Sequence, residues 1–194
     1  MRWAEFKDIL KRGVGRGTCP YQLAFLLEFG LRRFILSPQG LVERLGLEEG
    51  ARVVELGSGP GYFSAAVARR VSTGYLLLVD LQSEMLQKAR RKLARAGLGN
   101  AGFVQADGAA LPVLSGAWDC VYLVAVLGEL SDRRSCLREI HRILRPGGLL
   151  SLTEQPGDPD FIPLSEAREL AEGTGFCFEK AYGSGKNYTA SFRK

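Results

Sequence analysis

Short apolar runs alternate with amphipathic segments along most of this chain. Val53–Leu56 and Tyr75–Asp80 are mostly apolar runs that end in or contain one acid. Runs of this length are typical of strands that are covered on both faces. Between them, apolar residues recur at every third or fourth position, as expected of helices that pack one face on a sheet. The pattern therefore predicts that strands and helices follow one another in turn.

This alternation predicts five strands separated by helices and then a hairpin. The expected strands are 53–56, 75–80, 103–106, 117–126 and 149–154. One helix is expected to start at 64, and three more are expected over 82–96, 132–144 and 164–172. The hairpin pairs 176–181 with 187–192 across Gly183-Ser184-Gly185. Strands joined by helices form parallel sheets with right-handed crossovers and helices on both faces. We therefore predict an α/β fold with a doubly wound, seven-stranded, mostly parallel sheet and a terminal antiparallel hairpin strand.

The first part of the chain does not follow the alternation. Tyr21, Phe25 and Phe29 share one face of a helical pattern, in an apolar run that is too short and too charged to span a membrane. A helix packed on the domain, a cover over an apolar pocket, and association with a membrane surface all fit this pattern. We divide the chain into an N-terminal helical extension or cover, residues 1–38, and a ligand-binding domain, residues 39–194.

Composition is that of an ordinary globular protein, with 46% hydrophobic and 24% charged residues. The cysteines Cys19, Cys120, Cys136 and Cys177 are widely separated, which favours reduced, packed thiols over a disulfide framework or a metal site. The start of the chain mixes acids and bases, unlike a secretory signal. We therefore expect a cytoplasmic protein without a bound metal or a transmembrane segment.

The chain is basic, with a net charge of +5 and a pI of about 9.2. The densest basic cluster lies in the helix predicted over 82–96 and consists of Lys88, Arg90, Arg91, Lys92 and Arg95. Such a cluster is ordinarily a solvated helix face, and contact with nucleic acid is the alternative. No dedicated nucleic-acid-binding element accompanies the cluster.

The loop after the first predicted strand carries the clearest chemical signal. Gly57, Gly59 and Gly61 alternate between an apolar strand that contains Glu55 and the start of a helix at Ser64. Glycines at this junction permit unusual backbone dihedrals and a close approach to a ligand. The spacing differs from the GxGxxG fingerprint of nicotinamide-binding folds, and the Lys-Ser/Thr pair of triphosphate-binding loops is missing.

Acids recur where the later strands end. Asp80 closes the second predicted strand, where a carboxylate can accept both hydroxyls of a ribose. Asp107 and Gly108 close the third, where a carboxylate and a backbone N–H can bind the amine and a ring nitrogen of adenine. Glu129 and Glu154 lie near the ends of the next two strands. Asp80, Asp107 and Gly108 together indicate a ligand that contains adenosine.

On these residues, the chain resembles the class I S-adenosylmethionine-dependent methyltransferases, of the small-molecule type related to quinone-biosynthesis C-methyltransferases. Residues 55–61 are similar to the first motif of that family, 79–80 to its ribose acid, 107–112 to its adenine motif, and 137–148 to the helix and turn before its fifth strand. The resemblance covers roughly residues 40–194, and the motifs occur in the order of the family.

The resemblance implies a Rossmann-like domain that binds S-adenosylmethionine and releases S-adenosylhomocysteine. It assigns the glycine loop to the methionine portion of the cofactor, with open amides facing its carboxylate, and the acids to ammonium and hydroxyl groups. The residues that it assigns to the cofactor are Glu55, Gly57, Ser58, Gly59, Gly61, Asp80, Leu81, Met85, Asp107, Gly108 and Val124.

The reaction implied by the resemblance is an in-line displacement, for which a protein mainly aligns the reactants and excludes water. A general base helps only if the acceptor has a proton to lose. Glu129 and Glu154 are the candidates for that role, whereas His141 lies in a helix where the resemblance makes it structural. We expect a small, apolar or aromatic acceptor. Methylation of RNA or protein and a non-catalytic cofactor-binding module remain as alternatives, and the sequence does not indicate an oligomeric state.

Overall fold

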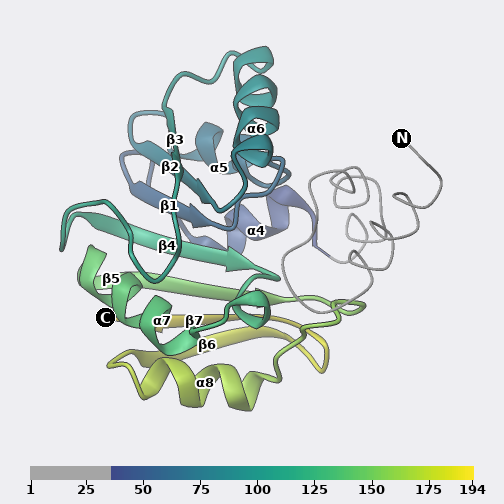
Figure 1. The fold of residues 1–194 in the computed structure, drawn as a ribbon, viewed down its shortest axis with the longest axis vertical. Coiled ribbons are helices and arrows are strands. Elements are labelled where there is room, and N and C mark those ends of the chain that lie inside the picture. The colour runs from purple at the N-terminus through teal and green to yellow at the C-terminus, as the bar shows by residue number, and fades with distance from the viewer. Residues whose placement is uncertain (1–35) are drawn as a thin grey trace.

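A single twisted sheet organises the computed structural model, which describes residues 36–194 (Figure 1). The sheet has seven strands in the order β3-β2-β1-β4-β5-β7-β6. Their bounds are β1 Arg52–Leu56, β2 Tyr75–Asp80, β3 Ala101–Gln105, β4 Trp118–Val124, β5 Leu144–Glu154, β6 Cys177–Ser184 and β7 Asn187–Arg193. The first five strands pair in parallel, and β7 runs antiparallel to both β5 and β6. The predicted seven-stranded, mostly parallel sheet is confirmed.

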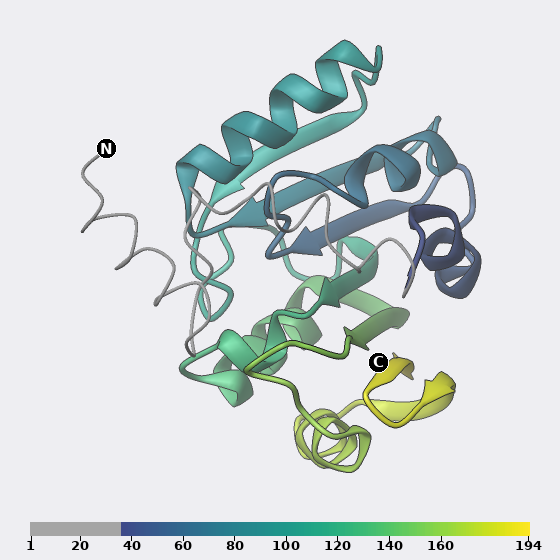
Figure 2. The ribbon, with the colours of Figure 1, turned by 90° about the vertical axis from the view of Figure 1, so that its right-hand side faces the viewer.

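Helices cover both faces of the sheet. The helices are α4 Pro38–Leu45, α5 Ser64–Arg70, α6 Ser83–Arg95, α7 Arg133–Ile143 and α8 Leu164–Glu172, with a short 3-10 helix, η2, at Leu127–Glu129. Apolar residues of α4, α5 and α6 form one core with one face of the sheet, and those of α7 and α8 form a second core with the opposite face. Figure 2, turned by 90°, shows α6 running alongside the β3 edge.

The chain order places a topological switch between two central strands. From β1 the chain moves outward to β2 and β3, and it then returns to place β4 on the other side of β1. The helices that follow β1 and β2 consequently lie on the opposite face of the sheet from the helix that follows β4. The chain leaves the carboxyl ends of β1 and β4 in opposite directions, so a crevice forms between them. Ligand sites of doubly wound sheets lie at this position.

The main differences from the sequence prediction lie at turns. The strand predicted from 149 starts at Leu144, because Leu144 leaves the helix with an extended backbone and pairs with Trp118 before the regular ladder resumes at Leu149. The closing hairpin turns at Gly185-Lys186, later than the predicted Gly183-Ser184-Gly185, since Ser184 still pairs with Asn187. Both changes lengthen strands without altering their order.

Helix α4 was not predicted. Ser37 accepts a hydrogen bond from the Gly40 amide at 3.0 Å, Pro38 occupies the first turn, and Gly46 ends the helix in a left-handed conformation. The predicted boundary between residues 38 and 39 falls in this first turn. The rest of the predicted N-terminal extension, with Tyr21, Phe25 and Phe29, lies outside the described residues.

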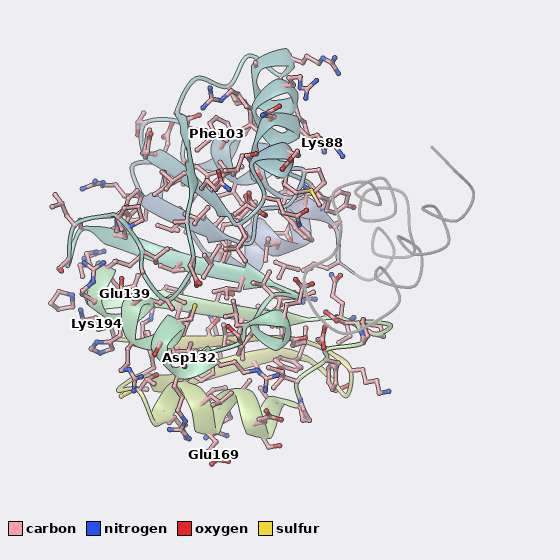
Figure 3. The ribbon with its side chains drawn as sticks, in the orientation of Figure 1. Lys88, Phe103, Asp132, Glu139, Glu169 and Lys194 are labelled. Atoms are coloured by element: carbon pink, nitrogen blue, oxygen red, sulfur yellow. The ribbon has the colours of Figure 1, made fainter. Side chains whose placement is uncertain are left out.

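None of the helices described between residues 36 and 194 is long and apolar enough to cross a membrane. The basic cluster lies on α6, where Arg90, Arg91 and Arg95 are exposed. Lys88 of the same cluster is labelled in Figure 3. These side chains surround a helix whose inner face, which includes Ala89 and Leu93, is buried, as expected of an amphipathic surface helix.

Candidate functional site

A cavity of about 280 Å³ opens at the carboxyl ends of β1, β2 and β4. It brings together almost all of the residues that the sequence assigned to a ligand. Those that line it are Glu55, Gly57, Ser58, Gly59, Asp80, Leu81, Met85, Asp107, Gly108, Val124 and Glu129. Gly61 and Glu154 are not part of the lining.

The glycine loop is fastened to the end of β2 by its own amides. The amides of Gly57 and Ser58 both donate to the Val79 carbonyl, at 2.8 and 3.1 Å, and the Gly59 amide donates to the Asp80 carboxylate at 2.8 Å. The expectation that these amides are open toward a ligand is therefore wrong in this structure. The loop still presents the Ser58 hydroxyl, which is buried in the lining and has no hydrogen-bond partner among the described residues.

Close packing explains two of the loop glycines. Gly57 has a φ of +70°, and a Cβ built on it would lie 2.4 Å from a methyl carbon of Val126. Gly61 has a φ of +79°, and its Cβ would lie 3.0 Å from the Cβ of Ala89 on α6. Gly57 thus lets the loop pack closely against the residues after β4, whereas Gly61 lets it pack against α6 and lies outside the cavity lining.

Both oxygens of the Asp80 carboxylate are hydrogen-bonded. One accepts from the Gly59 amide at 2.8 Å and the other from the Gln82 amide at 2.9 Å. Burial raises the pKa of Asp80 from its ordinary value, and these backbone donors oppose the shift. Asp80 therefore fixes the loop that it faces, and each oxygen retains acceptor capacity for a ligand hydroxyl.

Glu55 is a buried carboxyl beneath the loop. It accepts a hydrogen bond from the Ser64 hydroxyl at the start of α5 and lies opposite Tyr122 of β4 in the strand register. Burial raises its pKa to about 7, and repulsion by Asp80 acts in the same direction, whereas Ser64 and Tyr122 oppose the shift. A carboxyl with this pKa changes its proton occupancy near neutral pH.

The β3 side of the cavity is lined by Asp107 and Gly108, with Cys136 of α7 beside them. Asp107 accepts a hydrogen bond from the Ala109 amide at 2.9 Å, which shapes the turn after β3. Gly108 packs closely on Cys136 and Leu56, and a Cβ there would lie 2.9 Å from the Cys136 sulfur. The carboxylate of Asp107 thus lies beside a closely packed apolar contact between Gly108, Cys136 and Leu56.

The β4 side of the cavity was largely missed in the sequence. Ala125 has a φ of +54° and is the only non-glycine with a left-handed backbone in residues 36–194. Its amide donates to the Thr153 carbonyl of β5 at 2.8 Å, which holds the end of β4 against its neighbour. The lining continues through Val126, Leu130 and Asp132, the last of which caps α7 (labelled in Figure 3). Alanine carries no sequence signal for such a conformation.

Comparisons with known proteins agree with this geometry. The family model described as "Methyltransferase domain" matches residues 53–148. The ubiquinone/menaquinone biosynthesis C-methyltransferase UbiE of Haemophilus ducreyi is 36% identical over 143 residues, which is 73% of this chain and 54% of that protein. UbiE of Erwinia tasmaniensis is 35% identical over 144 residues, 73% of this chain and 56% of the relative. The chain spans about half the length of these curated relatives.

Solved structures give the same fold. A SAM-dependent methyltransferase from Aquifex aeolicus superimposes with a TM-score of 0.83 at 20% identity, covering 91% of this chain and 98% of that one. A putative methyltransferase from Methanococcus maripaludis gives 0.75 at 19% identity, with coverage of 93% and 95%. This chain belongs to the class I S-adenosylmethionine-dependent methyltransferases. The cofactor of the family is S-adenosylmethionine.

Two further groups of this methyltransferase lie outside the cavity lining. Glu154 ends β5 as a buried carboxyl whose pKa burial raises to about 8, with repulsion by Asp158 acting in the same direction. His141 packs edge-on against Phe176 at 5.1 Å between ring centroids.

Among residues 36–194, no group of three or more histidine, cysteine, aspartate or glutamate side chains could hold a metal ion. Of the two predicted acid candidates, only Glu129 reaches the cavity.

Proposed function

We propose that this methyltransferase moves the methyl group of S-adenosylmethionine to a ring carbon of a small, aromatic acceptor of the quinol type. The observation that carries the proposal is the cavity at the switch between β1 and β4, lined by the cofactor motifs of the family. The acceptor class is supported by the relatives, which are named as C-methyltransferases of ubiquinone and menaquinone biosynthesis. Both names denote quinones, whose reduced rings are electron-rich at carbon.

The lining fits S-adenosylmethionine along the order of the strands. Asp107 and Gly108 would hold the adenine at β3, and Asp80 would hold the ribose at β2. The unpartnered Ser58 hydroxyl and the buried Glu55 would hold the methionine portion at β1, next to Val124 of β4. When bound, the cofactor supplies the activated methyl group.

The charge of the lining also fits this cofactor. Five carboxyl groups line the cavity, namely Glu55, Asp80, Asp107, Glu129 and Asp132, and its described lining contains no lysine, arginine or histidine. S-adenosylmethionine carries an ammonium and a sulfonium group against one carboxylate, and an acid-lined cavity stabilises its net positive charge. The protein contributes orientation and a favourable field, as expected for a displacement that needs no covalent enzyme intermediate.

We place the acceptor at the β4 side, beyond the methionine portion. Val126 and Leu130 give this side of the lining an apolar surface. Glu129 lies in the same part of the lining and is the candidate base. It would take the proton of a quinol hydroxyl as the ring carbon accepts the methyl group and the carbon–sulfur bond of the cofactor breaks. Loss of the proton on the methylated carbon, with return of a proton to the oxygen, would then restore the aromatic ring. Glu154 is not assigned this role, because it lies outside the cavity lining.

Mass spectrometry with isotopically labelled S-adenosylmethionine tests the proposal. The protein is incubated with reduced 1,4-naphthoquinol and 1,4-benzoquinol probes that carry a short prenyl chain and a vacant ring carbon. We expect a labelled product whose fragments retain the methyl group on the ring. Calorimetry with S-adenosylhomocysteine and NADH accompanies it, and only the former is expected to bind.

Three results would contradict the proposal in different ways. Labelling of an oxygen instead of a ring carbon would reject C-methylation. Labelling of RNA or protein in a cell extract, with no labelled quinol, would favour the macromolecular alternative. S-adenosylhomocysteine binding without transfer to any component of the extract would favour a non-catalytic cofactor-binding module.

A further inference from the structure

The order of the strands sets positions along the cavity edge. In the proposed binding mode, adenine lies at β3, ribose at β2 and the methionine portion at β1 and β4. The next strand in the sheet is β5. A methyl acceptor that lies beyond the methionine portion therefore approaches the carboxyl end of β5.

An unusual side chain lies directly after that end. Gln155 follows the last residue of β5 and is 1% exposed. Neither the oxygen nor the nitrogen of its side-chain amide has a hydrogen-bond partner in the described part of the chain. Burying a primary amide without partners costs free energy, and native proteins seldom retain such a group without a use for it.

The strand register brings the end of β5, which Gln155 follows, beside the end of β4. Thr153 pairs with Val124 of β4, and the Ala125 amide donates to the Thr153 carbonyl at 2.8 Å. Beyond Val124, the chain continues into the cavity lining through Ala125 and Val126. Gln155, two residues past Thr153, therefore lies just beyond that lining, next to the strand end that forms it.

We propose that Gln155 is an acceptor-binding residue whose side-chain amide hydrogen-bonds an oxygen of the methyl acceptor. This inference rests on the proposed function, since it assumes that an acceptor binds beside β4. A primary amide offers two donors and one acceptor site, so it can donate to a phenolate or carbonyl oxygen and accept from a hydroxyl. The acceptor then supplies the partner that the described protein lacks, and an analogue without that oxygen leaves the amide unpaired.

The test compares Gln155→Leu with Ser151→Ala. Ser151 is a matched control because it belongs to β5, the strand that Gln155 follows, is 1% exposed, and also has an unpartnered side-chain oxygen among the described residues. It lies deeper in the sheet, away from the carboxyl end. For each variant, we measure the melting temperature, S-adenosylhomocysteine affinity, and kcat and KM with the prenylated 1,4-naphthoquinol.

We expect Gln155→Leu to keep or raise the melting temperature and to keep S-adenosylhomocysteine affinity within twofold, while KM for the quinol rises at least tenfold. Ser151→Ala should leave KM unchanged. A lower melting temperature for Gln155→Leu would overturn the inference, because it would show that the amide serves the fold. A quinol KM within twofold of the wild-type value would overturn it as well.

The proposed function can fail while the role of Gln155 is still tested. If the wild-type protein binds S-adenosylhomocysteine but methylates no quinol, the acceptor class is wrong. The labelled products that wild type and Gln155→Leu form in a cell extract are then compared. Equal yields at limiting extract would overturn the role of Gln155, whereas a loss confined to Gln155→Leu, with Ser151→Ala active, would support it.

Discussion

The Asp80 carboxylate accepts a hydrogen bond from the Gly59 amide at 2.8 Å, so the acid at the end of β2 holds the glycine loop that follows β1. The two features that the sequence assigned to different parts of a cofactor are thus a single structural unit. Asp80 also accepts from the Gln82 amide at 2.9 Å, which fixes the start of α6. Loss of this carboxylate therefore alters the shape of the loop as well as the ribose contact.

Asp80→Ala is expected to weaken S-adenosylhomocysteine binding by about 1.5–3 kcal/mol, the range for hydrogen bonds to a charged group. The fold should persist, because Asp80 lies at the end of a strand and its neighbours Leu78 and Val79 retain their packing. Titration calorimetry measures the affinity, and circular dichroism checks the fold.

Asp119→Ala provides the matched control at the opposite end of the sheet. Asp119 accepts a hydrogen bond from the Arg52 amide at 2.7 Å and pairs with Arg145, so it also holds backbone through a carboxylate. Its replacement should lower the melting temperature and leave S-adenosylhomocysteine affinity unchanged. Equal affinities for wild type and Asp80→Ala, with both folded, would show that Asp80 is only a turn residue.

Gly57→Ala should disturb both the fold and the site. The new methyl group would meet Val126 at 2.4 Å, so the end of β4 must shift. Together with the strain of an alanine at positive φ, we expect a loss of about 2–4 kcal/mol of unfolding free energy. Urea denaturation measures it, and S-adenosylhomocysteine affinity should fall at the same time.

Gly97→Ala separates backbone strain from the clash. Gly97 has a φ of +69°, close to the +70° of Gly57, but a Cβ on it meets nothing within 4 Å. It should cost about 1 kcal/mol and leave the cofactor affinity intact. Similar losses for the two variants would mean that Val126 moves aside freely, and the proposed link between the loop and β4 would be wrong.

The sequence predicts the sheet well because its signals are local. Continuous apolar runs such as Leu76–Val79 indicate strands covered on both faces, and the structure buries all of these residues. Acids at strand ends likewise predict a site at one edge, because parallel strands end together. Asp80 and Asp107 indeed line the same cavity.

What the sequence misses depends on contacts between distant segments. The left-handed Ala125 is stabilised by the Thr153 carbonyl of another strand, and Gln155 is buried although it follows the end of β5. The loop amides were assigned to a ligand because their partner, the Val79 carbonyl, lies on a different strand. Helix α4 was missed although the Ser37-Pro38 start is a local signal.

The stability of the protein should fall between pH 4.5 and about 7 because of Glu55. Burial raises the pKa of Glu55 from 4.5 to about 7, so the folded state holds a proton that the unfolded state has already lost in this range. The stabilisation that this proton gives the folded state is complete below pH 4.5, declines as the pH rises toward 7, and is absent above about 7. Urea denaturation at several pH values measures it.

Glu55→Gln should remove up to about 3 kcal/mol of this pH-dependent change in the free energy of unfolding. The reason is that the glutamine amide stays neutral and can still accept a hydrogen bond from Ser64. Burial also raises the pKa of Glu154, from 4.5 to about 8. The variant therefore still loses some unfolding free energy as the pH rises toward 8. An identical pH profile for wild type and Glu55→Gln would show that Glu55 is ionised throughout.

A protein that begins at Leu36 should retain S-adenosylhomocysteine binding and lose methyl transfer. The proposed cofactor site is built from Glu55, Asp80 and Asp107, all after that point, and Leu36 is kept because it is 3% exposed and belongs to the core beneath α4. If the aromatic face of the removed segment covers an apolar acceptor, which is one of the three interpretations of its pattern, its loss admits water and reduces orientation.

The melting temperature and the affinity of the truncated protein together distinguish a cover from a packed helix. If the segment only stabilises the domain, both quantities fall, and the cover is rejected. Replacing Tyr21, Phe25 and Phe29 by alanine in the full chain removes the aromatic face without removing the segment. A cover requires that this variant binds S-adenosylhomocysteine as wild type does while KM for the quinol rises, because the acceptor then loses apolar contacts that the cofactor never made.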